Sequence, residues 1–212
     1  MICKNLSVNN DGHLTLGGVD VTEMAKKYGT IVSFDFNYRA SFWKNREKEL
    51  QKIFGEIAGL SDIIIGNESD YMLCLGMKFE AVGRQEELSP VEHFKETVKQ
   101  VKKHFPEVTV LATNIREVKS ADRHLWGCVM QNGNEFEFVE PKEISIIDRI
   151  GGGDGFVGGL LYSIIKGFPH EEQLHFAWAS GVLASTFLTD YAQPESEEQI
   201  WDIWNKKVRI KR

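Results

Sequence analysis

Three consecutive glycines followed by an aspartate form the part of this sequence best suited to chemistry. They are Gly151, Gly152 and Gly153, and Asp154 comes directly after them. The apolar residues that follow recur at helical spacing: Phe156, Leu160, Leu161 and Ile164. We therefore expect the glycines at a helix N-terminus. Unpaired N–H groups and the helix dipole favour an anion at such a place, for example a phosphate or a developing oxyanion.

Two roles are open for Asp154. As a structural residue, its carboxylate would cap the helix or complement its dipole. As a general base, it would accept a hydroxyl proton while the adjacent amides hold a transferring phosphate. The segment does not match the phosphate-binding pattern GxxxxGK[ST]. It also lies late in the chain, outside the usual strand context of the dinucleotide-binding pattern GxGxxG.

Helices and strands are expected to alternate before the glycine run. Apolar periodicity predicts helices at residues 21–28, 44–58, 67–75 and 90–104. Short β-rich or buried stretches predict strands at residues 30–36, 62–65 and 108–112. Residues 76–87 are expected to form an irregular, charged connection.

The pattern changes to a hairpin and then to helices in the second half of the chain. The dipeptide Asn132-Gly133 is a strong turn signal between β-rich stretches at 126–131 and 135–139. Helices are expected at residues 153–166, 171–188 and 195–207. The predicted fold class is α/β, a mainly parallel sheet flanked by helices with an antiparallel edge hairpin. We expect one domain over residues 1–212.

The composition is that of an ordinary globular protein. The 212 residues are 42% hydrophobic and carry a net charge of −6, which argues against a disordered acidic chain and against a duplex-DNA binder. The sequence shows no apolar run of membrane-helix length and no signal-peptide pattern, so we expect a cytoplasmic protein without membrane or nucleic-acid partners. Cys3, Cys74 and Cys128 lack metal or disulfide spacing and are expected to be reduced core thiols.

Four segments together resemble the ribokinase-like (PfkB) family of carbohydrate kinases. The segment Asp148-Arg149-Ile150-Gly151-Gly152-Gly153-Asp154 closely resembles the family motif D-T-x-G-A-G-D. The other three resemble members of the family that phosphorylate 2-keto-3-deoxygluconate. They are residues 33–39 (SFDFNYR) with Trp43, residues 66–70 (GNESD) and residues 115–120 (IREVKS). The fold implied is ribokinase-like.

The resemblance implies an ATP-dependent sugar kinase that also uses Mg²⁺. The last aspartate of the motif, Asp154 here, would deprotonate the substrate hydroxyl that attacks the γ-phosphate of ATP. The amides of Gly151, Gly152 and Gly153 would form the anion hole, and Gly151 and Gly153 would also contact the nucleotide. The substrate implied is a sugar acid of the 2-keto-3-deoxygluconate type.

Two residues are implied to bind the sugar acid. Arg39 follows a predicted strand, where α/β sheets bind ligands, and its guanidinium can bind both oxygens of a carboxylate. Asp190 resembles a late aspartate that contacts substrate, although Thr189 stands where the family usually has glycine.

Further residues are implied to lie near the nucleotide. Asn37 would be close to its phosphates, and Thr113 and Arg116 would contact it from a loop after the 108–112 strand. Asn67 and Asp70 resemble a motif that positions phosphate and Mg²⁺ through water, with aspartate in place of the usual glutamate. A helix N-cap is the structural alternative for Asn67.

The position of the glycine-rich motif differs from the family. In family members it lies in the last third of a longer chain, whereas here it begins at residue 148 of 212. We expect the N-terminal part of the family fold, with its lid over the sugar, to be missing, and a homodimer to form through an exposed sheet edge. Two alternatives to a sugar-acid kinase stay open: a nucleotide-binding remnant without kinase activity, and a kinase for a neutral sugar such as fructose or ribose.

Overall fold

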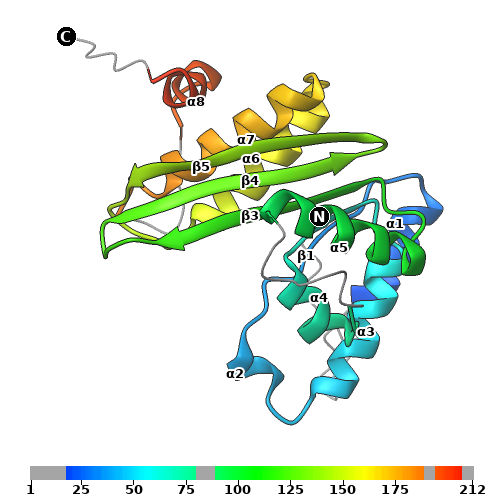
Figure 1. Ribbon diagram of the computed structural model, residues 1–212. Helices are drawn as coiled ribbons and strands as arrows, with labels where there is room; N and C mark the ends of the chain where they lie inside the picture. Colours follow the sequence, from blue (N-terminus) through cyan, green and yellow to red (C-terminus); the bar gives the residue numbers. More distant parts are fainter. Residues whose placement is uncertain (1–17, 80–88, 189–193, 207–212) are drawn as a thin grey trace, which may run out of the picture. The chain divides into compact units, whose positions relative to one another are not determined.

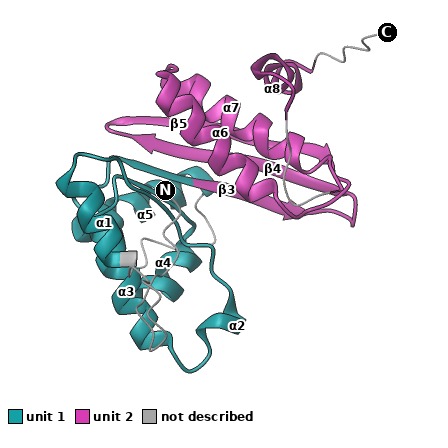
Figure 2. Ribbon diagram, turned by 180° about the vertical axis from the view of Figure 1, so that it is seen from behind, with its two compact units in different colours: residues 1–112 teal, residues 113–212 magenta. Residues whose placement is uncertain are grey.

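The computed structural model describes residues 18–79, 89–188 and 194–206. By their internal contacts the residues divide into two compact units, Met1–Ala112 and Thr113–Arg212, which Figure 2 shows in different colours. Strands follow one another in the order β1-β2-β3-β4-β5, and β3 (Val110–Val118) passes from the first unit into the second. The expected single domain over residues 1–212 stays a prediction.

Unit 1 is built around short parallel strands with helices between them. Its elements are α1 (Gly18–Lys27), β1 (Ser33–Asp35), α2 (Ala40–Trp43), α3 (Glu47–Gly59), β2 (Ile63–Ile65), α4 (Glu68–Leu75) and α5 (Pro90–His104). β1 pairs with β2, and β2 with the first residues of β3, both in parallel. All three residues of β2 are buried, which is the pattern of a strand covered on both faces.

Local signals fix the ends of α5. Ser89 caps the helix by accepting a hydrogen bond from the amide of Glu92, while the Glu92 carboxylate accepts one from the amide of Ser89. Pro90 occupies the first turn, where its missing N–H costs nothing. Basic residues in the last turn complement the helix dipole. The predicted range 90–104 is therefore confirmed at both ends.

Unit 2 places two helices against a long hairpin. Its elements are the remainder of β3, β4 (Arg123–Asn132), β5 (Glu135–Ser145), α6 (Gly152–Lys166), α7 (His170–Ala184) and α8 (Glu197–Trp204). β4 and β5 pair antiparallel at the end of the strand order, so the predicted edge hairpin is confirmed and the sheet is mixed. Gly133 turns the hairpin with a φ of 58°. Figures 1 and 2 show α6 and α7 side by side along one face of β4 and β5.

Large apolar side chains fill the space between these helices and the hairpin. Trp126 of β4 is 1% exposed, and Phe156 and Leu160 of α6 are completely buried. The indole Nε1 of Trp178 donates a hydrogen bond to the carbonyl of Trp126 (2.8 Å), which ties α7 to β4. Trp201 and Trp204 dock α8 on α7, where their rings lie 5.2 Å from Phe176 and 5.6 Å from Trp178, respectively.

Several boundaries differ from the sequence predictions. β3 extends six residues past Ala112, since its second half lies beside β4 and gains sheet pairing that a local sequence window does not contain. Helix α7 ends at Ala184 rather than at residue 188. The short helix α2 was not predicted. Residues 80–88 of the predicted 76–87 connection lie outside the described residues.

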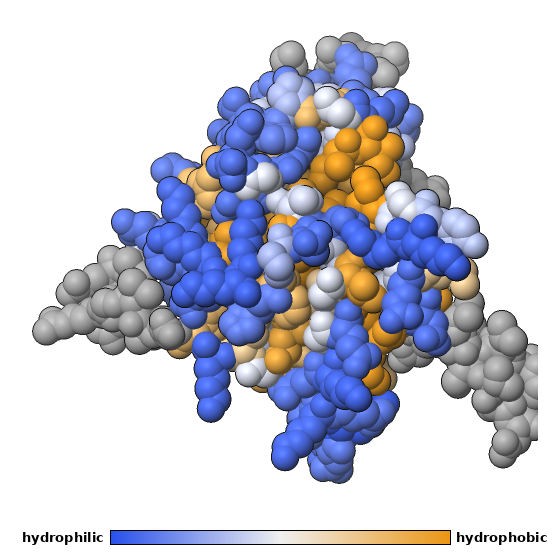
Figure 3. Space-filling model, turned by 90° about the vertical axis from the view of Figure 1, so that its right-hand side faces the viewer, coloured by the Kyte–Doolittle hydropathy of each residue, from blue (hydrophilic) through white to orange (hydrophobic). Residues whose placement is uncertain are grey.

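The cysteine prediction is confirmed for Cys74 and Cys128, which are buried free thiols. Burial raises the pKa of Cys74 to about 12, and nearby Asp70 adds to the shift, so the thiol stays protonated. Apolar side chains also reach the surface, where one face shows a hydrophobic area among hydrophilic side chains (Figure 3). Within residues 18–79, 89–188 and 194–206, no helix combines the length and apolar character that crossing a membrane requires.

The burial of Leu160 in α6 predicts how much stability the protein loses when this side chain is shortened. Leu160→Ala is expected to lower the free energy of unfolding by about 2–5 kcal/mol, because it leaves a cavity at a completely buried position. Ile165→Ala is the matched control on the same helix: Ile165 is 83% exposed, so a change within about 0.5 kcal/mol is expected. Urea denaturation followed by circular dichroism measures both, and equal losses would contradict this packing.

Candidate functional site

The glycine run forms the N-terminus of α6, as predicted. Gly151 is the N-cap and has left-handed backbone angles (φ 80°, ψ −15°), which a residue with a side chain rarely adopts. Its carbonyl accepts the first helical hydrogen bond, from the amide of Gly155 (2.7 Å). The amides of Gly152, Gly153 and Asp154 lie in the first turn, where the helix offers no carbonyl partner. The turn thus presents N–H groups suited to an anion.

Gly152 and Gly153 have opposite surroundings. A Cβ atom on Gly152 would lie 2.9 Å from Cη2 of Trp126 and 2.6 Å from Oγ of Ser185, so only glycine fits. A Cβ atom on Gly153 would meet no atom within 4 Å. The turn is therefore packed against the core on one side and open on the other, where a ligand can approach the backbone.

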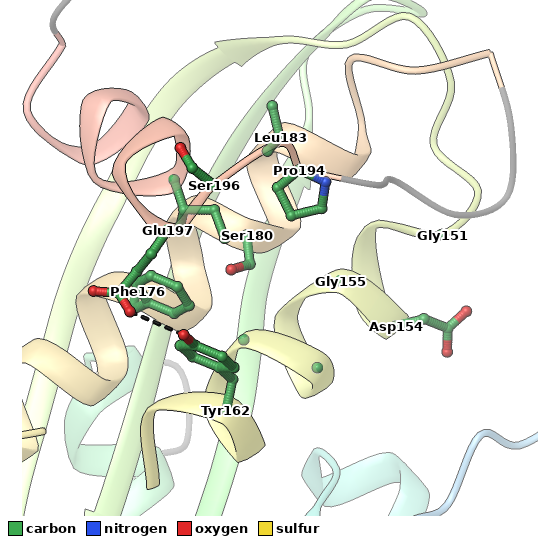
Figure 4. Close-up of a pocket in the computed structure, with 13 residues that line it drawn as sticks. Gly151, Asp154, Gly155, Tyr162, Phe176, Ser180, Leu183, Pro194, Ser196 and Glu197 are labelled. Atoms are coloured by element: carbon green, nitrogen blue, oxygen red, sulfur yellow. Dashed lines mark hydrogen bonds between the residues drawn. The ribbon is translucent and has the colours of Figure 1, made fainter. Parts of the chain in front are cut away.

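Asp154 stands in the first turn of α6 and is exposed. Figure 4 shows its carboxylate pointing away from Ser180, Tyr162 and Phe176. The described part of the structure records no side-chain cap hydrogen bond at this helix start. Its carboxylate is consequently accessible to a substrate hydroxyl, as a general base must be.

A cavity of about 440 Å³ begins beside Asp154 and runs between α6, α7 and residues 194–200. Glycines 155, 158 and 159 form one wall, and Phe176 and Leu183 of α7 lie on the other. The hydroxyl of Ser180 is buried and has no hydrogen-bond partner among the described residues. The Tyr162 hydroxyl donates to the Glu197 carboxylate (2.9 Å; Figure 4).

The charges of this cavity do not match a sugar acid. Its described lining contains the carboxylates of Asp154 and Glu197 and no basic side chain. A ligand carboxylate would be repelled there, because like charges at short range are unfavourable. The cavity therefore suits an uncharged part of a ligand better than a carboxylate.

Thr113 and Arg116 lie within β3, so the predicted loop at 113–117 is wrong. Sheet pairing with β4 continues the strand through these residues, and Thr113 is 9% exposed. The Arg116 guanidinium lies over the Trp126 ring at 4.2 Å, while the Trp126 indole donates to the side-chain oxygen of Asn114 (2.9 Å). Desolvation, and secondarily repulsion from Arg149, lower the pKa of Arg116.

In unit 1, Asn37 and Arg39 follow the end of β1, as predicted. Asn37 has a left-handed backbone (φ 43°), and its amide donates to the Asp35 carboxylate at 3.2 Å. This short turn directs the chain away from the sheet. Arg39 is exposed, and its guanidinium donates a hydrogen bond to the carbonyl of Tyr38 (3.0 Å). It forms no ion pair with a carboxylate of the described residues. Its guanidinium is thus accessible to a ligand carboxylate.

Asn67 and Asp70 form a reciprocal cap at the start of α4. The Asn67 side-chain oxygen accepts from the amide of Asp70 (3.0 Å), and the Asp70 carboxylate accepts from the amide of Asn67 (2.9 Å). Asn67 therefore acts as the N-cap that was the structural alternative. Desolvation raises the pKa of Asp70, although the backbone hydrogen bond opposes the shift. A metal-positioning role for the two residues stays a prediction.

The structure brings the predicted residues together in two groups. In unit 1, Asp35 is paired with Ile65, so Asn37 and Asn67 follow the same edge of two parallel strands. In unit 2, Gly151, Gly152, Gly153 and Asp154 lie with Arg116, whose Nη2 atom is 3.2 Å from the Cβ position of Gly152. Asp190 lies outside the described residues. Within the described ranges, no group of three or more His, Cys, Asp or Glu side chains could hold a metal.

Sequence reasoning missed two buried residues, Ser180 and His124. Ser180 and His124 carry buried polar atoms without described partners, which only the folded arrangement reveals.

Comparisons with known proteins agree on one family and fold. A model of the pfkB family carbohydrate kinases matches residues 15–191. The 5-dehydro-2-deoxygluconokinase of Clostridium tetani is 26% identical over 178 residues, covering 83% of this chain and 47% of that protein. The structure of 2-dehydro-3-deoxygluconokinase from Thermotoga maritima is similar with a TM-score of 0.76 and 29% identity, covering 88% of this chain and 53% of that chain.

An Escherichia coli protein solved in complex with ATP and Mg²⁺ shares the fold, with a TM-score of 0.66 and 20% identity over 91% of this chain and 55% of that chain. The chain spans about half the length of the curated relatives it matches.

The hydrogen bonds at the start of α4 predict that Asn67 stabilises the fold as an N-cap. Asn67→Ala is expected to lower the free energy of unfolding by about 1 kcal/mol, because the Asp70 amide loses its acceptor. Asn67→Ser keeps an oxygen acceptor at the N-cap and is expected to lose much less. Thermal and urea unfolding measure both variants, and an unchanged midpoint for Asn67→Ala would contradict the cap.

Proposed function

Since the chain belongs to the pfkB family of carbohydrate kinases, we propose that it serves phosphoryl transfer from ATP to a hydroxyl of a sugar acid, with Asp154 as the general base. The observation that supports this function best is the exposed Asp154 carboxylate in the same helical turn as three unpaired amides. The base and the anion site are therefore held together by one short segment of backbone.

Phosphoryl transfer depends on positioning and charge stabilisation more than on covalent chemistry. The Asp154 carboxylate accepts the proton of the attacking hydroxyl. Meanwhile the amides of Gly152, Gly153 and Asp154 donate hydrogen bonds to the oxygens of the transferring phosphoryl group, on which negative charge is concentrated. Gly151 contributes its left-handed backbone angles at the N-cap, a conformation that glycine adopts without strain.

The described residues fit ATP with a magnesium ion held mainly by phosphate. Mg²⁺ keeps several waters and needs only one or two protein carboxylates when phosphates supply the rest, and it neutralises phosphate charge when bound. Asn67 and Asp70 are the proposed water-mediated contacts to that ion, and Asn37, Thr113 and Arg116 the proposed contacts to the nucleotide. Asp70 accepts the amide of Asn67 through one carboxylate oxygen, and its other oxygen is the proposed acceptor for the ion's water.

The proposed substrate is a keto-deoxy sugar acid, most simply 2-keto-3-deoxygluconate. The names of the Clostridium tetani and Thermotoga maritima proteins both denote kinases of dehydro-deoxygluconates. Arg39 is the proposed partner of the substrate carboxylate and Asp190 a second contact. We place the protein in the cytoplasm, where ATP is available, and a homodimer stays part of the proposal.

A nucleotide-binding protein without sugar-kinase activity is the second candidate. The observation that favours it is the cavity beside Asp154, whose described lining has two carboxylates and no basic side chain to pair with a sugar acid. The glycine turn and Arg116 would then bind nucleotide, while turnover with any sugar would be absent. Calorimetry with ATP-Mg²⁺ beside an ADP-release assay over a panel of sugar acids and neutral sugars separates the two functions.

Replacement of the base gives the first functional prediction. Asp154→Asn is expected to lower the turnover number by about 10²–10⁴-fold while nucleotide still binds, because it removes only the proton acceptor. Asp122→Asn, which removes an exposed carboxylate elsewhere in unit 2, is the matched control and should keep full activity. A coupled assay of ADP release measures both. Full activity of Asp154→Asn would reject the assignment.

The second functional prediction concerns Arg39, the proposed partner of the substrate carboxylate. Arg39→Gln is expected to raise the KM for 2-keto-3-deoxygluconate by about 10–100-fold, the range for losing a charged hydrogen bond. Ribose and fructose, which lack a carboxylate, should show no such change. Arg46→Gln is the control, because Arg46 is an exposed arginine of unit 1 that pairs with Glu49. A KM unaltered by Arg39→Gln would exclude this contact.

A further inference from the structure

The indole of Trp126 supports two separate parts of the candidate site. The side chain is 1% exposed, and Cη2 of its six-membered ring lies 2.9 Å from the Cβ position of Gly152 at the start of α6. The Arg116 guanidinium lies over the same ring at 4.2 Å. The orientation of this one ring therefore affects the glycine turn and Arg116 together.

An irregularity of the hairpin occurs next to Trp126. The register between β4 and β5 shifts between Trp126 and Cys128. Gly127 stands between these two residues, and a Cβ atom there would lie 2.6 Å from the carbonyl oxygen of Val139, so only glycine fits. Bulges of this kind are common beside functional sites, where they change the direction of a neighbouring side chain. The bulge thus adjoins the side chain on which the glycine turn rests.

Asn114 of β3 holds the indole by its nitrogen. The Trp126 Nε1–H donates a hydrogen bond to the side-chain oxygen of Asn114 at 2.9 Å. Asn114 and Arg116 are two residues apart on β3, so they share one face of the strand. A buried indole N–H normally has a hydrogen-bond partner, and rotation of the ring would break this one. Asn114 therefore keeps the ring in one orientation.

Helix α7 holds the rest of Trp126 in place. The Trp178 indole donates to the carbonyl of Trp126 at 2.8 Å, which fixes the backbone. A Cβ atom on Gly181 would lie 2.9 Å from Cη2 of Trp126, so α7 also closes the space beside the ring. Packed interiors transmit displacements because they contain few voids. A change in the angle of the ring is therefore passed on to Gly152.

We propose that Asn114 is a positioning residue of the anion-binding turn: its side-chain oxygen orients the Trp126 indole, and the indole orients the turn and Arg116. The inference rests on the proposed function and adds to it a residue that acts through Trp126. Donors oriented in advance are effective because they need no rearrangement when charge develops. A small displacement of the turn should therefore affect turnover more than binding of the sugar acid.

Steady-state kinetics of the full chain test this role. Asn114→Ala is expected to lower the turnover number about tenfold and to leave the KM for 2-keto-3-deoxygluconate within about twofold, because the turn is displaced and the sugar contacts are not. Asn132→Ala is the matched control, since Asn132 also bridges two elements of unit 2, donating to Gln173 (3.1 Å) near the start of α7. Its turnover number should equal that of wild type. An unchanged turnover number in Asn114→Ala would overturn the inference.

A double-mutant cycle shows whether Asn114 acts through the indole. Trp126→Phe removes the N–H group that Asn114 accepts. Adding Asn114→Ala to Trp126→Phe is expected to lower the turnover number by less than about twofold, because two residues that act as one unit do not contribute independently. Losses that multiply in the double variant would show that Asn114 acts by another route and would overturn the inference.

Spectra of the ligand-free protein give a readout that does not depend on activity. In a ¹H–¹⁵N correlation experiment, Asn114→Ala is expected to shift the indole signal of Trp126 and the amide signals of Gly152 and Gly153. Asn114→Asp keeps an oxygen acceptor and should shift these two amides less. If both amides stay in place in Asn114→Ala, the side chain only stabilises the fold and the inference is wrong.

Calorimetry with inorganic pyrophosphate separates the inference from the proposed function. Asn114→Ala is expected to weaken pyrophosphate about 3–10-fold, the range for one impaired hydrogen bond, while Asn132→Ala binds it as wild type does. This loss in a protein without sugar-dependent ADP release would uphold the positioning role and reject the kinase proposal. Equal pyrophosphate affinity in wild type and Asn114→Ala would overturn the positioning role, as would wild-type protein that binds no pyrophosphate.

Discussion

The close approach of α6 to Trp126 and α7 is the constraint on which the candidate site depends. A Cβ atom on Gly181 of α7 would lie 2.9 Å from both the Gly152 carbonyl oxygen and Cη2 of Trp126. Glycine at 152 and 181 therefore lets the helix start sit directly on the core. The same contact holds the turn rigidly, so its amides are oriented before any ligand arrives, and pre-orientation is what makes such donors effective.

The start of α6 differs from the other described helix starts in its backbone conformation. Side chains cap the helix starts at Asn67, Ser89 and Ser196, and α2, α3 and α7 lack such a cap as α6 does, but among these helices only α6 has an N-cap residue with left-handed backbone angles. The buried hydroxyl of Ser180, which has no described partner, lies against Gly159 of the same helix. Exceptions to local rules that gather at one place are characteristic of functional sites.

Features of this fold that depend on neighbouring residues could be predicted from the sequence, whereas features that depend on contacts between distant residues could not. The ends of α5 were predictable because Ser89 and Pro90 act within one turn, and Asp154 because the glycines precede it directly. The extension of β3 through Arg116 was not, since pairing with β4 maintains it. The contact of Arg116 with Trp126 was not predictable either, because the two residues come from two strands that only the fold brings together.

Amide chemical shifts test the central claim, that the start of α6 binds phosphate, most directly. In a ¹H–¹⁵N correlation experiment with ADP and Mg²⁺, the largest shifts are expected at Gly152, Gly153 and Asp154, because their N–H groups would become hydrogen-bond donors to phosphate. Adenosine at the same concentration should leave these amides nearly unchanged. Saturation with ADP and Mg²⁺ that shifts other amides and leaves these three in place would contradict the account.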